Sequence, residues 1–272
     1  MGHLTKQEEH GSKVWYWVLA TAILILVLYM YGQMNTAFLY MLSNALPPLT
    51  GLLAFSMAGL ASRRSWIGWA DVSSKVWLGY ASGMFLWFLG ETISVAYPLL
   101  LHIPTPFPSV GDVFWLAGYI PLLSVILLQV WPFREAFSRG KFAAVLVFVI
   151  FLMILVLAVL VPPSIAEEHE TAAVLVSLAY PLLDAVLLPV AILSFVFFMK
   201  GSLWRPMLFV VAGIIMNTSA DVLYSWTVLL GIYYDGHPLE LLFHWSYLAF
   251  ALGFYLQLKQ ARSMIDLRSR SA

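Results

Sequence analysis

Residues 142–161 read FAAVLVFVIFLMILVLAVLV, a run of twenty residues without a single polar side chain. A helix of this length is ~30 Å long and matches the hydrocarbon core of a bilayer. The rest of the chain has the same character, since 62% of its 272 residues are hydrophobic, only 10% are charged and the mean hydropathy is +0.88. These values lie far outside the range of soluble domains. The sequence therefore predicts an all-α integral membrane protein.

Eight apolar runs of about this length predict eight transmembrane helices. A cleaved signal peptide is the alternative for the first run, because Lys13 precedes it, but the run is too long for the apolar part of a signal peptide. The predicted spans begin at Val14, Asn44, Val76, Val113, Phe142, Thr171, Met207 and Leu239.

The basic residues predict the orientation of these spans. All 14 Lys and Arg residues fall in the two tails and in the loops after spans 2, 4 and 6. Because Lys and Arg are retained on the cytoplasmic side, we expect both termini in the cytoplasm. The other loops and the spans contain acids instead, namely Glu91, Asp112, Glu167, Glu168, Glu170, Asp184, Asp221, Asp235 and Glu240.

The two halves of the chain are similar to each other at an offset of 128 to 130 residues. The matched pairs are Val14 with Phe142, Ser56 with Asp184, Glu91 with Asp221, Asp112 with Glu240 and Tyr119 with Tyr247. Leu and Val match everywhere among apolar helices, so the acidic and tyrosine pairs carry the comparison. We expect two tandem four-helix repeats in the same orientation, at 14–134 and 135–260, between cytoplasmic tails at 1–13 and 261–272.

A proline-rich segment, IPTPFP at 103–108, precedes the fourth span and predicts an extended loop. Ser109 and Asp112 follow it at the spacing of a capping box, which places a negative charge at the positive end of a helix. The segment GHPLE at 236–240 precedes the eighth span in the same manner, with a proline near the first helical position and an acid in the first turn.

Polar and aromatic side chains also lie on common helix faces further into the predicted spans. Stripes descend from Asp112 and Glu240, and three further acids lie deeper in the predicted spans, each with an aromatic or hydroxyl companion at helical spacing. Ionisable residues inside a bilayer are costly and indicate function by default, although carboxyl groups that only hold helices together are the alternative. The candidate ligand-binding residues are Trp87, Glu91, Asp112, Trp115, Tyr119, Tyr180, Asp184, Asn217, Asp221, Tyr224, Glu240, His244 and Tyr247.

These candidates lie in spans 3, 4, 6, 7 and 8, which we expect to enclose a pocket open to the cell exterior. Spans 1 and 5 are expected to face lipid. Carboxylates beside aromatic faces suit an organic cation. Glu240 and His244, one turn apart, are candidate ligands for a metal ion such as zinc. His102 and His237, near the outer ends of spans 3 and 7 to 8, could join them or lie at the membrane interface. A hydrogen-bonded interior histidine is the alternative.

The composition also excludes several classes of protein. The chain has no cysteine, so it has no disulfides, thiolate metal sites or cysteine nucleophiles. It lacks the HExxH, GxSxG and P-loop motifs, and span 8 has no mid-helix lysine for a retinal Schiff base. The basic residues are spread along loops, so nucleic-acid binding is not indicated. The sequence identifies no cofactor.

The segments LGETISVAY (89–97), IPTPFPSVGDVFWLAGYIPL (103–122) and SADVLYSWTVLLGIYYDGHPLELLFHWSYLAFALGFYL (219–256) resemble a known membrane region. It lies N-terminal to the output domains of diguanylate cyclases and of archaeal sensor histidine kinases. The resemblance implies an eight-helix sensory module with Glu91, Asp112, Asp221 and Glu240 at motif positions. Only a short basic segment follows Gln260, so we expect a truncated or stand-alone version, with a cytoplasmic kinase or cyclase partner or a homodimer.

Taken together, the residues and the resemblance favour a non-enzymatic, receptor-like module in the lipid bilayer that binds a small cation, metal or lipid-derived ligand. A cation- or proton-coupled transporter of small solutes is the alternative, because duplication and buried acids are typical of transporters. An intramembrane lipid hydrolase is a third, because the acids in GE and SAD motifs are weakly similar to those of the lysoplasmalogenase family.

Overall fold

The structure is a computed structural model that describes residues 2–136, 139–166 and 170–271. Within these ranges every regular element is helical, and eight helices are long and apolar enough to cross a membrane, which confirms the predicted number of spans. The predicted acids Glu167 and Glu168 lie outside the described residues. The long helices are α1 (Gly2–Gly32), α2 (Thr36–Ser65), α3 (Val72–Ala96), α4 (Val110–Val130), α5 (Arg139–Ala166), α6 (Thr171–Phe198), α7 (Trp204–Leu229) and α8 (Glu240–Ser271).

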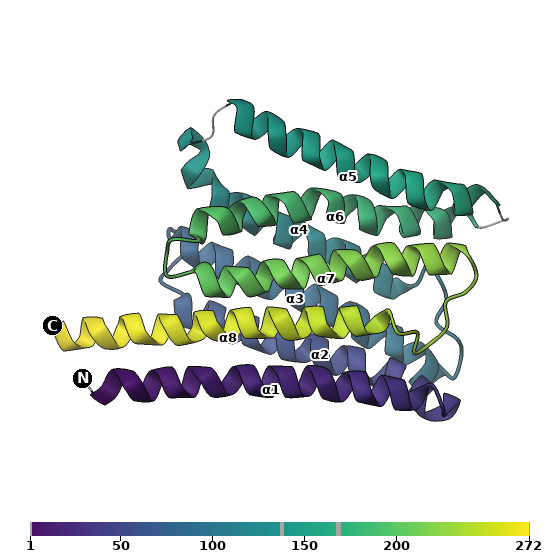
Figure 1. The fold of residues 1–272 in the computed structure, drawn as a ribbon, viewed down its shortest axis with the longest axis horizontal. Coiled ribbons are helices and arrows are strands. Elements are labelled where there is room, and N and C mark those ends of the chain that lie inside the picture. The colour runs from purple at the N-terminus through teal and green to yellow at the C-terminus, as the bar shows by residue number, and fades with distance from the viewer. Residues whose placement is uncertain (1, 137–138, 167–169, 272) are drawn as a thin grey trace.

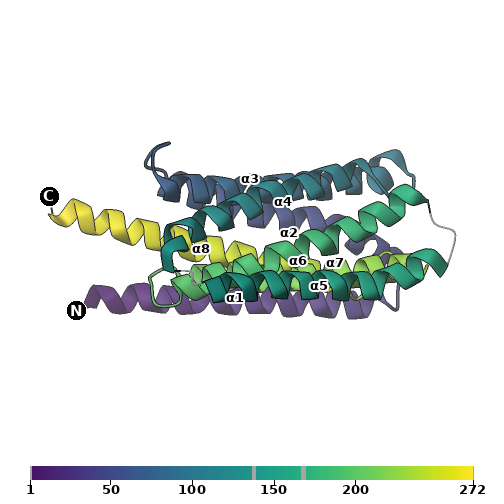
Figure 2. The same ribbon diagram turned by 90° about the horizontal axis from the view of Figure 1, so that it is seen from above.

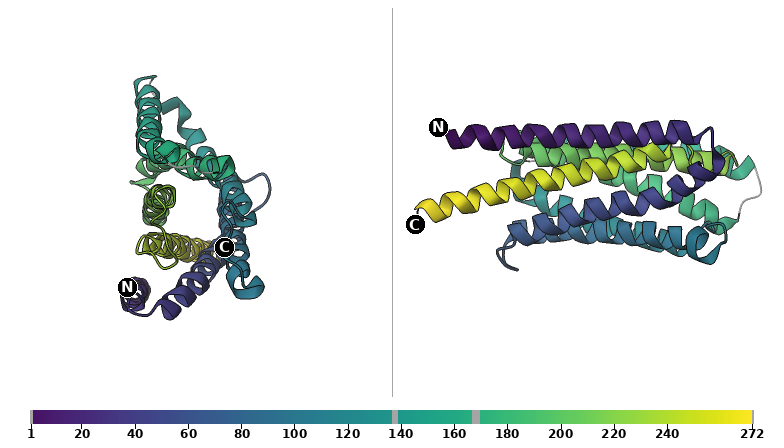
Figure 3. Two further views of the ribbon diagram at one scale, coloured as in Figure 1. Left: turned by 90° about the vertical axis from the view of Figure 1, so that its right-hand side faces the viewer. Right: turned by 90° about the horizontal axis from the view of Figure 1, so that it is seen from below.

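The helices run side by side along one axis, and both described ends of the chain lie at the same end of the bundle (Figure 1). Six of them form a closed ring by their contacts, in the order α2, α3, α4, α6, α7, α8 and back to α2. Helix α1 packs outside the ring on α8 and α2, and α5 packs outside it on α6 and α7. Figure 2 shows α3 and α4 on the side of the bundle opposite α1 and α5, and Figure 3 shows the ring end on.

The second span begins earlier than the sequence predicts. Helix α2 starts at Thr36 rather than near Asn44, because the side chain of Asn35 accepts a hydrogen bond from the backbone N–H of Phe38 and caps the helix. The helix then continues through Pro47 and Pro48. The polar first turns lower the local hydropathy, so an apolar run marks only the later part of the span.

The third span ends in an irregular turn. Helix α3 stops at Ala96 and continues as a short π-helical segment, η1 (Tyr97–Leu101), with Pro98 near its start. His102 closes the segment with a left-handed backbone and is exposed. By contrast, α6 runs without interruption through Pro181 and Pro189. The break in α3 therefore leads the chain into the loop before α4, whereas α6 remains one continuous helix.

The half of the ring nearest the two termini is filled by a hydrophobic core. Trp77 and Tyr80 near the start of α3 are packed with Phe254 of α8, and their ring centroids lie 5.6 to 6.5 Å apart. Met207 near the start of α7 and Ile126 near the end of α4 are fully buried in the same cluster. Tight packing at this end leaves any cavity to the opposite end of the ring.

The sequence predicts that helix α1 faces lipid only, but part of this helix is buried in the protein. From Val14 to Gly32 most of its side chains are exposed, but Tyr29 is fully buried and packs with Ile25, Leu39 and Leu248. Helix α5 exposes much of its apolar surface, in line with its position outside the ring. The expectation of a lipid-facing helix therefore fits α5 and is wrong for the last turns of α1.

Small residues let α3 and α4 approach closely. Gly79 and Gly83 are spaced four residues apart on α3, the spacing of a common helix-packing motif in membranes. A methyl group added at Gly83 would lie 2.6 Å from the Leu122 side chain of α4. One added at Gly118 of α4 would overlap the indole of Trp87 and lie 3.3 Å from the carbonyl oxygen of Gly83. The two backbones are in near contact there.

We expect Gly118→Ala to destabilise the protein by ~1–3 kcal/mol, the usual cost of overpacking. The Trp87 indole cannot move away freely, because its Nε1 donates to the Trp115 carbonyl at 3.0 Å. The midpoint of thermal unfolding in detergent measures the effect. Gly59→Ala is the matched control, because a methyl at Gly59 of α2 meets no atom within 4 Å. Equal midpoints for the two variants would contradict close packing of α3 on α4.

Candidate functional site

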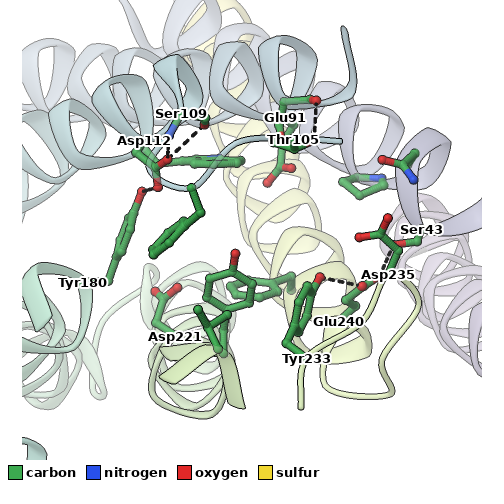
Figure 4. Close-up of a pocket in the computed structure, with 18 of the residues that line it drawn as sticks. Ser43, Glu91, Thr105, Ser109, Asp112, Tyr180, Asp221, Tyr233, Asp235 and Glu240 are labelled. Atoms are coloured by element: carbon green, nitrogen blue, oxygen red, sulfur yellow. Dashed lines mark hydrogen bonds between the residues drawn. The ribbon is translucent and has the colours of Figure 1, made fainter. Parts of the chain in front are cut away.

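A cavity of about 590 Å³ lies at the end of the ring opposite the termini (Figure 4). Its walls come from α2, α3, α4, α6, α7 and α8, from the loop at 104–107 and from the loop at 231–235. Five acids line it, and no Lys or Arg among the described residues does. The acids are Glu91, Asp112, Asp221, Asp235 and Glu240.

Asp112 holds the start of α4 in place, as the sequence predicts. Its Oδ2 accepts from the backbone N–H of Ser109 at 2.6 Å and from the Ser109 hydroxyl at 2.9 Å, and the Ser109 hydroxyl oxygen accepts from the N–H of Gly111 at 3.1 Å. The predicted capping box is confirmed. The other oxygen, Oδ1, accepts from the Tyr180 hydroxyl of α6 at 2.8 Å. The same carboxyl group thus caps α4 and ties it to α6.

Glu240, the first residue of α8, has its full set of hydrogen-bond donors. Oε1 accepts from the backbone N–H of Gly236 and from the Tyr233 hydroxyl, each at 2.8 Å. Oε2 accepts from the hydroxyls of Tyr29 and Ser43, again at 2.8 Å each. A carboxylate offers about four acceptor positions. Glu240 is therefore fully satisfied by α1, α2 and the preceding loop.

His244 lies one turn below Glu240 and is fully buried. Its Nε2 lies 2.8 Å from the Tyr29 hydroxyl oxygen, and its Nδ1 lies 3.3 Å from the Thr50 hydroxyl oxygen. Both ring nitrogens therefore have hydroxyl neighbours, and Tyr29 lies within reach of both His244 and Glu240. Across the described ranges no three His, Asp or Glu side chains form a group that could hold a metal. The two-residue metal site at Glu240 and His244 stays a prediction.

Two of the hydrogen bonds between the halves of the chain hold deep acids of the cavity. The Tyr247 hydroxyl of α8 donates to Glu91 of α3 at 2.7 Å. The Tyr119 hydroxyl of α4 lies 3.0 Å from Oδ2 of Asp221 on α7, which also accepts from the Asn217 side chain at 2.6 Å. Each deep acid that lines the cavity is therefore held by a tyrosine from the other half.

Asp184 of α6 does not line the cavity. It is fully buried behind Tyr119, whose hydroxyl lies 3.1 Å from its Oδ1, and its Oδ2 has no hydrogen-bond partner among the described residues. The other predicted ligand-binding residues all line the cavity. The structure thus brings the predicted side chains to one place but puts Asp184 in a second layer.

The loop between α7 and α8 forms one side of the cavity and lies outside the predicted membrane spans. Burial, reinforced by Glu240, raises the pKa of Tyr233 well above its usual value, so this phenol stays a neutral donor. Burial also raises the pKa of Asp235, an effect that Asn44 partly offsets. Burial lowers the pKa of His237, which keeps its imidazole neutral near pH 7. The loop therefore adds no positive charge beside the cavity near neutral pH.

Aromatic side chains form much of the remaining wall. Trp87 is packed edge-on against Tyr119 and Tyr247, with ring centroids 5.6 and 6.3 Å apart. Tyr224 packs edge-on against Phe107 of the proline-rich loop at 6.1 Å. Aromatic faces next to carboxylates attract organic cations. The wall combines long-range attraction for positive charge with apolar contact area.

The sequence missed several residues of the site. Helix α2 supplies Ser43, Asn44 and Pro47 to the wall, although it was not among the spans expected to enclose the pocket. The loop residues at 233–235, YYD, line the cavity too, and their polar and aromatic character five to seven residues before Glu240 was a usable signal. Tyr29 gave no such signal, because it is one of three tyrosines in an apolar span that contains no acid. The two histidines His102 and His237 do not line the cavity.

Comparison of the chain with models of protein families, with curated proteins and with solved structures gave no match.

Proposed function

We propose that this chain is a receptor-like membrane module that binds a small organic cation in the cavity and transmits the binding event along α8. The observation that carries the proposal is the cavity itself, with five acids and many aromatic side chains in one wall and no Lys or Arg among the described residues that line it. A volume of about 590 Å³ is in the range of sites for small molecules.

An organic cation fits this wall better than a bare metal ion. A metal site needs several ligands at short distance from one point, and the acids of the cavity are separated by tyrosines that use their oxygens. Trp87, Trp115 and Tyr224 add aromatic surface. Such surface stabilises an alkylammonium group by cation–π contact, by ~0.5–2 kcal/mol for each good contact.

Among the described acids of the cavity, Glu91 and Asp235 accept the fewest hydrogen bonds and have the most acceptor capacity left for a ligand. Glu91 accepts from Tyr247 through Oε1, with the Trp115 indole beside it. Asp235 is exposed at the cavity and has Asn44 next to it. Glu240, in contrast, uses all four of its acceptor positions within the protein. We infer that Glu91 and Asp235 bind the ligand's positive charge and that Glu240 holds the wall together.

Helix α8 offers a route for a signal to the opposite end of the bundle. It begins at Glu240, carries His244 and Tyr247 into the site, and continues without a break to Ser271, ~48 Å away at 1.5 Å per residue. A ligand can shift α8 only by as much as it prefers one helix position over another. The receiver of such a signal, in this proposal, is a cytoplasmic kinase or cyclase or a second copy of the chain.

Three observations support the finer proposals of tandem repeats and of cytoplasmic termini. The bonds Tyr119 to Asp221 and Tyr247 to Glu91 exchange partners between the halves in the manner of a two-fold relation. The order of helices in the ring has the same symmetry, since α2 packs on α3 and α8 while α6 packs on α7 and α4. The basic loops all lie at the end with the termini, the side retained in the cytoplasm.

The orientation can be tested cleanly because the chain has no cysteine. We expect Glu170→Cys, at the cavity end, to react with a membrane-impermeant maleimide in intact cells. Gly201→Cys, in the exposed loop between α6 and α7 at the other end, should react only after permeabilisation. The opposite labelling pattern would place the cavity on the cytoplasmic side.

Removal of the Glu91 charge tests the binding site. We expect Glu91→Gln, whose carbonyl can still accept from Tyr247, to weaken choline binding about tenfold, or ~1.4 kcal/mol. Ligand-induced thermal shift of the purified protein measures it. Glu170→Gln is the matched control, because Glu170 is exposed at the same end and does not line the cavity. The neutral isostere 3,3-dimethylbutan-1-ol should give no shift; equal shifts from both compounds would refute charge recognition.

The raised pKa of Asp235 predicts a pH dependence. A bound cation favours the ionised carboxylate, so choline affinity is complete above this pKa and falls as the pH drops through it. Because the pKa is raised, the fall begins at a higher pH than for an ordinary aspartate. Asp235→Asn should bind more weakly at neutral pH and lose this part of the pH profile. A profile identical to that of the wild type would remove Asp235 from the site.

A further inference from the structure

Tyr119 stands between two buried aspartates and touches both. Its hydroxyl oxygen lies 3.1 Å from Oδ1 of Asp184 and 3.0 Å from Oδ2 of Asp221. Both carboxyl groups are buried, on α6 and α7, and Asp221 also accepts from Asn217 at 2.6 Å. Asp221 and Tyr119 line the cavity, whereas Asp184 does not. The three groups thus form a chain from the second layer to the cavity wall.

The number of protons in this chain follows from its contacts. A phenol has one hydrogen and can donate it to one carboxyl oxygen only. The second contact is a hydrogen bond only if the other carboxyl group carries a proton and donates to the phenol oxygen. Asp221 already accepts a short bond from Asn217, as a carboxylate does. An arrangement that satisfies all of these contacts has the proton on Oδ1 of Asp184, which donates to Tyr119, which donates to Asp221.

Among the described residues near these three groups, no Lys or Arg supplies a positive charge that could replace this proton. Helices α4, α5 and α7 pack against α6. Helix α8 also packs against α7. The titratable groups near the pair are Tyr119 and Asp112 on α4, Tyr180 on α6, Tyr224 on α7, Tyr247 on α8 and Glu91 on α3. From 142 to 161, α5 has no polar side chain. Two bare carboxylates on one phenol in such a setting would repel each other strongly.

Unsatisfied atoms next to Asp184 point the same way. Oδ2 of Asp184 and the Thr218 hydroxyl of α7 are both buried, and neither has a hydrogen-bond partner among the described residues. A charged oxygen without a donor in an apolar interior is far more costly than the carbonyl oxygen of a neutral acid. A protonated Asp184 leaves only that carbonyl oxygen to be satisfied.

We propose that Asp184, Tyr119 and Asp221 form a proton-binding site that holds one proton and exchanges it with the cavity. In the exchange, the O–H bond at Oδ1 of Asp184 breaks as its proton moves to the Tyr119 oxygen. The phenol passes its own hydrogen to Oδ2 of Asp221, where a new O–H bond forms. Asp221 then gives that proton to water in the cavity, and both aspartates are left ionised.

Release of this proton is coupled to binding of the cation, and this coupling rests on the proposed function. An organic cation in the cavity stabilises a carboxylate at Asp221 and at Asp184 behind it. Binding of the cation therefore releases the proton, and a low pH opposes binding. The site would act as a proton-for-cation exchanger, whether the protein senses the cation or moves it.

Infrared spectroscopy tests the shared proton without any ligand. The purified full-length chain at pH 7 should show the C=O stretching band of a protonated carboxyl group. Asp184→Asn should remove a component of this band, and Tyr119→Phe should shift it to higher frequency because the acid loses its hydrogen-bond acceptor. Glu170→Gln should leave it unchanged. A band of unchanged intensity and position in Tyr119→Phe overturns the proposal, even if Asp184→Asn does not fold.

Calorimetry with choline tests the exchange. Titrations in two buffers with different heats of protonation give the number of protons released on binding, which should be about one in the wild type and near zero in Asp184→Asn. Choline binding without proton release overturns the exchange and leaves the proposed function standing. No choline binding in the wild type overturns the proposed function, and the infrared result alone then decides on the shared proton.

Discussion

A carboxyl group in an apolar setting without a cation must find hydroxyl or amide donors, and this requirement organises the hollow end of the ring. Tyrosine hydroxyls meet it in almost every case, and each comes from a different helix than the acid it serves. The pairs are Tyr29 with Glu240, Tyr180 with Asp112, Tyr247 with Glu91, and Tyr119 with Asp221 and Asp184. The acids are thus the links between helices as well as the negative charge of the cavity.

The same bonds divide the acids into two kinds. Glu240 and Asp112 sit at helix starts, where backbone N–H groups and side-chain hydroxyls use most of their acceptor positions. Glu91 and Asp235 have fewer donors and face the cavity. The helix starts therefore fix the shape of the wall, and the less satisfied acids remain for a ligand.

The sequence predicted those features that repeat along a helix or compete with lipid. Runs such as 142–161 fixed the number of spans, and the spacing from Ser109 to Asp112 predicted the cap of α4. The acidic and aromatic residues of the wall were predicted because polar groups in apolar spans are conspicuous. Their convergence on one cavity depends on the order of helices in the ring, which no local pattern encodes.

The features that the sequence did not predict also depend on contacts that no local pattern encodes. Tyr29 lies in an apolar span and has its partner Glu240 211 positions away, so nothing near it in the sequence announces the bond. The early start of α2 depends on a single cap at Asn35. Asp184 could not be assigned to a second layer, because its distance from the cavity depends on where Tyr119 stands between α4, α6 and α7.

The prolines inside α2 have one more consequence. Pro47 and Pro48 have no N–H, so the carbonyl oxygens of Ser43 and Asn44, four residues earlier, lose their usual helical donors. Ser43, Asn44 and Pro47 all line the cavity. Peptide oxygens freed in this way carry partial negative charge and do not titrate. Where such an oxygen faces the cavity, it attracts positive charge at any pH.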